Sequence, residues 1–149
     1  MNDLYNVSEV KLTYESNNTR KRKLKVNSSA KIYELMVNNW EQIEYRESFK
    51  ILLLDISNHV LGVNIVSMGG ISGSIVDVRM ILQCALLANA SAIVVIHNHP
   101  SGNVKPSCAD DAITHRIKQA SKIMDIALLD HLIITKDGYY SYADDGRME

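Results

Sequence analysis

Two histidines and one aspartate stand at a spacing that suits a metal ion. His97 and His99 are separated by one residue, and Asp110 follows eleven positions after His99. Two imidazoles and one carboxylate can bind a catalytic zinc ion, which keeps its fourth coordination position open for water. A bound zinc lowers the pKa of such a water to about 7 and polarises a carbonyl oxygen. The sequence therefore predicts a hydrolytic metal site.

The two histidines are expected to leave the end of a central strand. Residues 92–96 form a β-branched run that is typical of a strand buried on both faces, and the run ends directly in His97. Alternate residues of a strand point to the same side, so His97 and His99 are expected to present their rings side by side. Pro100 then stops strand pairing, and Gly102 lets the chain fold back.

The third ligand is expected at the start of the following helix. Ser107 is the predicted helix cap, and Asp110 stands three residues later in the capping-box position. The positive end of the helix dipole favours an anion there. The exposed hydroxyl of Ser107 could also hydrogen-bond a developing oxyanion, although capping alone would account for both residues.

Hydrolysis also needs a group that takes a proton from water and passes it to the leaving amine. No glutamate occurs between Ser48 and Met148, so the candidates lie upstream at Glu41, Glu44 and Glu47. Glu47 is the preferred base, because it enters a predicted strand that could lie beside the histidine-bearing strand. The alternative for Glu47 is an ordinary solvated residue.

Hydrophobic periodicity predicts three helices, five strands and one mixed sheet sandwiched by helices. The first helix is expected to begin at Ser28 or Ser29 and to extend through Trp40 to Ile43 on its buried face. The second follows Asp77 and is apolar nearly all round, which predicts a central position. The expected strands are 49–54, 60–66, 92–96, 128–135 and 139–142, the second helix covers 78–89, and the third turns Ile113, Ile117, Ala120 and Met124 inward.

We divide the chain into a polar arm, 1–27, and a catalytic domain, 28–149. Residues 10–14 and 24–26 are expected to be strands of the arm that join the sheet. The arm contains a basic cluster at 20–25. A solvated turn between strands explains this cluster better than DNA binding does.

Composition limits the class of protein. With 149 residues, the chain is long enough for one domain with a substantial core. The formal net charge of −1 gives no global electrostatic reason to bind nucleic acid or an anionic membrane. No apolar run reaches the length of a membrane span, and two cysteines form no disulfide framework. We therefore expect a cytoplasmic protein without a membrane partner and make no prediction of its oligomeric state.

The spacing of His97, His99, Ser107 and Asp110 resembles the motif of JAMM (MPN-plus) metalloproteases at every position. The longer string from His97 to Gly102, with Pro106-Ser107 and the later 129–133, is similar to the RadC branch of that family. The resemblance extends from about residue 44 to residue 146. It implies the cytidine-deaminase-like α/β sandwich of JAB/MPN domains, with a mixed sheet between helices.

The same resemblance implies roles for individual residues. His97, His99 and Asp110 would bind Zn²⁺, Glu47 would be the general acid and base, and Ser107 would stabilise the tetrahedral intermediate. The implied activity is hydrolysis of a peptide or isopeptide bond in a peptide or protein substrate.

Two other functions remain open. Longer RadC proteins carry a helix-hairpin-helix segment suited to DNA, and residues 1–40 have no such hairpin, but a DNA-associated role in repair or recombination could still use the basic arm. A non-catalytic MPN scaffold is the other alternative, which the intact motif argues against. His131 is either a residue that orients a metal ligand or one half of an internal polar pair with Asp130.

Overall fold

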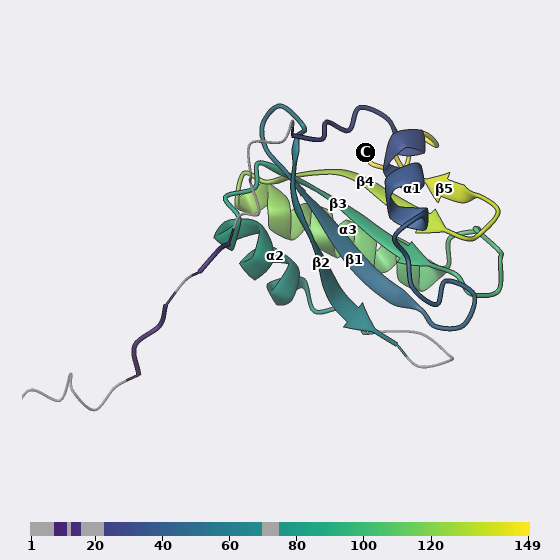
Figure 1. The fold of residues 1–149 in the computed structure, drawn as a ribbon, viewed down its shortest axis with the longest axis horizontal. Coiled ribbons are helices and arrows are strands. Elements are labelled where there is room, and N and C mark those ends of the chain that lie inside the picture. The colour runs from purple at the N-terminus through teal and green to yellow at the C-terminus, as the bar shows by residue number, and fades with distance from the viewer. Residues whose placement is uncertain (1–7, 12, 16–22, 70–74) are drawn as a thin grey trace, which may run out of the picture.

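The computed structural model describes residues 8–11, 13–15, 23–69 and 75–149. Within these ranges the chain forms one mixed sheet with helices on both faces (Figure 1). This architecture confirms the α/β sandwich expected from the sequence. In chain order the elements are α1 (Ser29–Val37), β1 (Ser48–Leu54), β2 (Val60–Met68), α2 (Val78–Leu87), β3 (Ala92–Asn98), α3 (Cys108–Ile123), β4 (Ala127–Ile134) and β5 (Tyr139–Ser141).

The five strands are ordered β2-β1-β3-β4-β5. β3 and β4 are parallel, whereas β1 runs antiparallel to both β2 and β3, and β5 runs antiparallel to β4. Every residue of β3 is buried, which confirms a central strand covered on both faces. Alternate residues of β3 therefore enter two separate cores, one shared with α2 and α3 and the other shared with α1.

Helix α1 covers one face of the sheet and is shorter than expected. Ser28 caps it by accepting a hydrogen bond from the Lys31 backbone N–H at 3.2 Å, as predicted. The helix ends at Val37, so Trp40 and Ile43 lie beyond it, in the connection to β1. Trp40 is nevertheless buried in the core on this face. The prediction of a helix through Ile43 was wrong, because a buried residue in a compact connection can repeat the helical spacing by coincidence.

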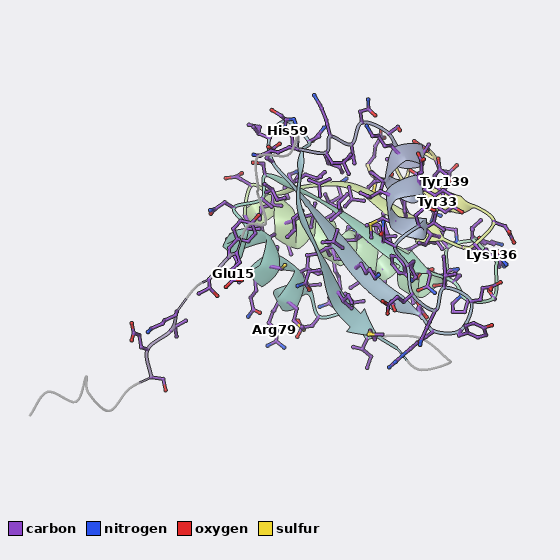
Figure 2. All side chains as sticks on the ribbon, in the orientation of Figure 1. Glu15, Tyr33, His59, Arg79, Lys136 and Tyr139 are labelled. Atoms are coloured by element: carbon purple, nitrogen blue, oxygen red, sulfur yellow. The ribbon has the colours of Figure 1, made fainter. Side chains whose placement is uncertain are left out.

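Helix α1 is fixed to the last hairpin through Tyr33, in the middle of the helix. The rings of Tyr33 and Tyr139 stack with their centroids 4.8 Å apart, and Figure 2 shows the two side chains together where α1 meets β5. The Tyr33 hydroxyl also donates to the carbonyl of Thr135 at 2.9 Å. These contacts therefore hold α1 against the hairpin formed by β4 and β5.

Helices α2 and α3 cover the opposite face, and both differ from expectation. α2 begins after Asp77 as predicted, but Met80 and Leu86 are about half exposed, so α2 is a peripheral helix and not a central one. The buried positions of α3 are Asp110, Thr114, Ile117 and Ser121, so three of the four are polar. Of the inward positions predicted for α3, Ile117 is fully buried, Ile113 and Ala120 are partly exposed, and Met124 is 43% exposed.

The arm contributes little regular structure where it is described. Residues 8–11 and 13–15 form no strand, and Lys25 makes only an isolated antiparallel bridge with His59. The basic cluster at 20–25 lies partly outside the described residues, which do not include 20–22. Among the residues that are described, no helix is long and apolar enough to cross a membrane.

Candidate metal centre

The candidate site forms where the end of β3, the beginning of β1 and the first turn of α3 meet. The antiparallel register places Phe49 of β1 opposite His97 of β3. Their rings stack, with centroids 5.8 Å apart and planes inclined by 10°. Because β1 pairs with β3, the sequence prediction that the strand after Glu47 lies beside the histidine-bearing strand is confirmed. Glu47 directly precedes β1.

The three expected ligands come together at the site. The Nε2 atoms of His97 and His99 lie 2.9 Å apart. One oxygen of Asp110 lies 3.1 Å from the Nε2 of His97, and the other lies 3.4 Å from the Nε2 of His99. His97 and Asp110 are buried, whereas His99 is partly exposed. The arrangement therefore opens to solvent on the His99 side.

Glu47 adds a second carboxylate. Glu47, His97 and His99 form a group that could hold a metal ion, because one potential ligand atom of each lies within 4.8 Å of the other two. Glu47 is partly buried. The site thus offers two imidazoles and two acids, one acid from the start of β1 and the other from α3.

Asn98 positions the segment that carries Glu47, a role that the sequence analysis missed. Its side chain points to the opposite face of β3 from the two histidines and is fully buried. The Asn98 Oδ1 accepts a hydrogen bond from the Ser48 backbone N–H at 2.7 Å. Its Nδ2 donates to the backbone carbonyls of Ile43 and Arg46, each at 2.8 Å. An asparagine between two candidate metal ligands, His97 and His99, was the available signal.

Ser107 caps α3 as predicted. Its Oγ accepts a hydrogen bond from the Asp110 backbone N–H at 3.1 Å, and the Asp110 carboxylate accepts one from the Ser107 N–H at 2.7 Å. This reciprocal pair is a capping box. The Ser107 side chain is exposed and its Oγ acts as an acceptor in the cap, so its hydroxyl hydrogen is available to another group.

The outer ring nitrogens of the two histidines are also occupied. The Nδ1 of His99 lies 2.7 Å from the carbonyl oxygen of Asn103. The Nδ1 of His97 lies 2.8 Å from the Nε2 of His131, a β4 residue with no exposed surface. His131 therefore contacts His97 through its ring, while its backbone N–H donates to Asp130 at 2.7 Å. The His131 ring thus contacts His97 and not Asp130, which His131 meets only through its backbone N–H.

The site is electrostatically prepared for a cation. Burial alone would raise the pKa of Asp110, but hydrogen bonds with His97 and His99 outweigh it and hold the pKa well below its usual range. The hydrogen bond with Asp110 raises the pKa of His99. Burial lowers the pKa of His131 well below its ordinary value, which keeps this ring neutral. An ionised carboxylate thus faces two imidazoles in a largely buried setting.

Comparison with known proteins agrees with this geometry. A family profile described as the RadC-like JAB domain matches residues 26–147. A UPF0758 protein of Flavobacterium johnsoniae is 43% identical over 122 residues, which are 82% of this chain and 53% of that relative. UPF0758 proteins of Thermotoga maritima and Chlorobium phaeovibrioides are 37% and 34% identical. The matched regions cover 83% and 93% of this chain, and 55% and 60% of the two relatives. The chain therefore spans little more than half the length of these relatives.

Proposed function

The chain belongs to the RadC-like JAB domain family, and we propose that it is a zinc-dependent metallopeptidase that hydrolyses a peptide or isopeptide bond. One observation carries the proposal. The Nε2 atoms of His97 and His99 converge on the Asp110 carboxylate. The Nδ1 atoms of the two rings are hydrogen-bonded on the other side, to His131 and to the Asn103 carbonyl oxygen. The inner nitrogens, which face each other and the Asp110 carboxylate, are therefore the ring atoms that would bind a metal.

The donor set suits zinc. Two imidazole nitrogens and one carboxylate oxygen are three protein ligands, and a fourth position is left for water or substrate. We assign Asp110 as the carboxylate ligand because its two oxygens contact both Nε2 atoms directly. Glu47 approaches the two rings only within the wider 4.8 Å group. This separation leaves Glu47 available for proton transfer.

The residues of the chain then supply the remaining chemistry. A zinc ion bound here would lower the pKa of a water to about 7 and polarise the scissile carbonyl. Glu47 takes a proton from the attacking water and delivers it to the leaving amine. The Ser107 hydroxyl hydrogen, free of the helix cap, donates to the oxyanion of the tetrahedral intermediate. Asn98 keeps Glu47 in place by bonding the backbone on both sides of it.

Metal content tests the ligand assignment. We expect about one zinc per chain after purification without chelator or metal-affinity tag. The His99→Ala and Asp110→Asn variants should lose this zinc, whereas Glu47→Gln should retain it. His115 is an exposed histidine of α3, so His115→Ala is the matched control and should keep the wild-type zinc content. A wild-type protein that neither contains zinc nor takes it up at neutral pH would contradict the proposal.

Hydrolysis tests the role of Glu47. A peptide library and isopeptide-linked peptides are incubated with the zinc-loaded protein, with and without chelator. We expect cleavage that chelator abolishes and that Glu47→Gln abolishes while retaining its zinc. Full activity of Glu47→Gln would show that another group is the base.

A further inference from the structure

We propose that Thr114 and His131 are positioning residues that fix the tautomer of His97 and thereby aim its Nε2 lone pair at the metal site. The inference rests on the proposed function, because it assigns a purpose to two buried residues behind the ligands. A row of hydrogen bonds joins these residues, and it begins at a group that can only accept a hydrogen bond.

That group is the backbone carbonyl oxygen of Asp110, which carries no hydrogen. The Thr114 Oγ1 lies 2.6 Å from it, so the threonine hydroxyl must donate its only hydrogen to this oxygen. A threonine within a helix commonly makes such a bond to the preceding turn. Here the same Oγ1 also lies 2.5 Å from the Nδ1 of His131. Because the hydroxyl hydrogen is already used, Nδ1 of His131 must carry the hydrogen of this second bond.

His131 passes the constraint on to His97. The His131 ring is fully buried and bonds to His97 and Thr114, and no carboxylate among the described residues hydrogen-bonds to it. A charged ring in that setting would be costly, so His131 is neutral and its Nε2 is an acceptor. The Nδ1 of His97, 2.8 Å away, must then be the donor. A neutral His97 that carries its hydrogen on Nδ1 has a lone pair on Nε2.

His99 is fixed in the same sense by a simpler contact. The carbonyl oxygen of Asn103 can only accept, so the Nδ1 of His99 at 2.7 Å carries the hydrogen. When both rings are neutral, their Nε2 atoms, 2.9 Å apart, therefore present lone pairs beside the Asp110 carboxylate, whereas in the metal-free protein a hydrogen on Nε2 bonds that carboxylate. Neutral rings in this arrangement repel one another unless a cation lies between them. The hydrogen bonds of His131, His97 and His99 to groups behind the site thus fix three tautomers that together define a cation site.

Packing keeps the rings from rotating out of this arrangement. Phe49 stacks on His97 with an interplanar angle of 10°. Tyr142 stacks on His131, with centroids 5.0 Å apart and planes inclined by 8°. Each ring is therefore held flat against an aromatic neighbour, and the hydrogen bonds select which nitrogen faces which partner.

Substitution of Thr114 tests the row without changing the side chain of any proposed ligand. Thr114→Val keeps the shape but removes the acceptor for the Nδ1 hydrogen of His131. That hydrogen is then better placed on Nε2 of His131, which forces the hydrogen of His97 onto its own Nε2, the ligand atom. We expect zinc affinity, measured by competition with a chromogenic chelator, to fall about 10–100-fold, as is typical when a group that orients a metal ligand is lost. Thr114→Ser keeps the hydroxyl and should bind zinc nearly as tightly as wild type.

A second measurement reads the tautomers directly in the wild-type chain. Long-range ¹H–¹⁵N correlation spectra of the zinc-loaded protein should show His131 with its hydrogen on Nδ1 and a bare Nε2. A hydrogen on Nε2 of His131 would overturn the inference, and this result does not require any variant to fold or any substrate to be known. Undiminished zinc affinity in a folded Thr114→Val protein would also overturn it while leaving the proposed function intact. A wild-type protein that binds no zinc would overturn both.

Discussion

Asn98 offers a sharp test of how the site is assembled, because it supports Glu47 without facing the metal ligands. Asn98→Ala removes three hydrogen bonds to backbone groups. Each bond to a neutral group contributes about 1 kcal/mol, and a buried N–H left without a partner costs about 1–3 kcal/mol. The N–H of Ser48 is the group left in that state, because Ser48 is buried. The two lost bonds to carbonyl oxygens and the orphaned Ser48 N–H therefore predict a loss of about 3–5 kcal/mol of unfolding free energy.

The loss is measured by urea unfolding of the metal-free protein. Trp40, the only tryptophan, lies in the core on the same face of the sheet as Asn98 and reports the transition by its fluorescence. Because domains of this size are stable by about 5–15 kcal/mol, we expect the variant to stay folded in water. Zinc affinity should remain close to wild type, since the histidines occupy the other face, whereas hydrolysis should fall because Glu47 loses its support.

Two further variants separate hydrogen bonding from volume. Asn98→Asp keeps the acceptor for Ser48 but turns an oxygen toward two carbonyl oxygens, so it should also be destabilised. Asn39 is the matched control, because it is exposed and makes one bond to the Leu35 carbonyl at 2.8 Å. Asn39→Ala should change stability by no more than about 0.5 kcal/mol. If Asn98→Ala were as stable and as active as the Asn39 variant, the reasoning about this support would be refuted.

Three other predictions concern the fold and the loop that carries His99. The backbone N–H of His59 and that of Ser57 lower the pKa of Asp55. The stabilisation that Asp55 gives relative to Asp55→Ala should therefore be present at pH 5 and shrink as the pH falls below about 3.9, measured by urea midpoints. Ile117→Ala, in the core under α3, should cost about 2–5 kcal/mol of unfolding free energy, and a loss below 1 kcal/mol would contradict the assigned burial. Gly102 has a φ of +86° and an added Cβ would meet nothing within 4 Å, so Gly102→Ala should cost about 1–2 kcal/mol through the backbone alone, measured as a lower thermal midpoint.

Those features of the site that depend on local chemistry could be predicted from the sequence. The capping box of Ser107 and Asp110 needs only a helix start and a spacing of three residues, and it is present. The buried run before His97 indicated a central strand, and its pairing beside Glu47 followed from the apolar strand after that glutamate. The architecture of a mixed sheet between helices followed from the order of these elements.

Features set by tertiary packing could not be predicted in this way. Thr114 and Ser121 are buried because α3 presents them to the sheet, where Thr114 meets His131 from another element. Hydrophobic periodicity selects Ala120 and Met124 as buried positions in place of these polar residues. The buried face of α3 expected from the sequence is therefore rotated about the helix axis relative to the observed one. Trp40 is buried outside any helix for a similar reason, because its partners come from strands that are distant in sequence.

The last residues of the domain form the rear wall of the candidate centre. Tyr142 covers His131 and donates to Asp111 at 2.7 Å, and Arg147 donates to the same Asp111 oxygen at 2.7 Å. Removal of residues 142–149 would take Tyr142 away and uncover a His131 ring that now has no exposed surface. If the proposed zinc is bound, we expect such trimming to speed its release from a protein whose proposed ligands are all still present.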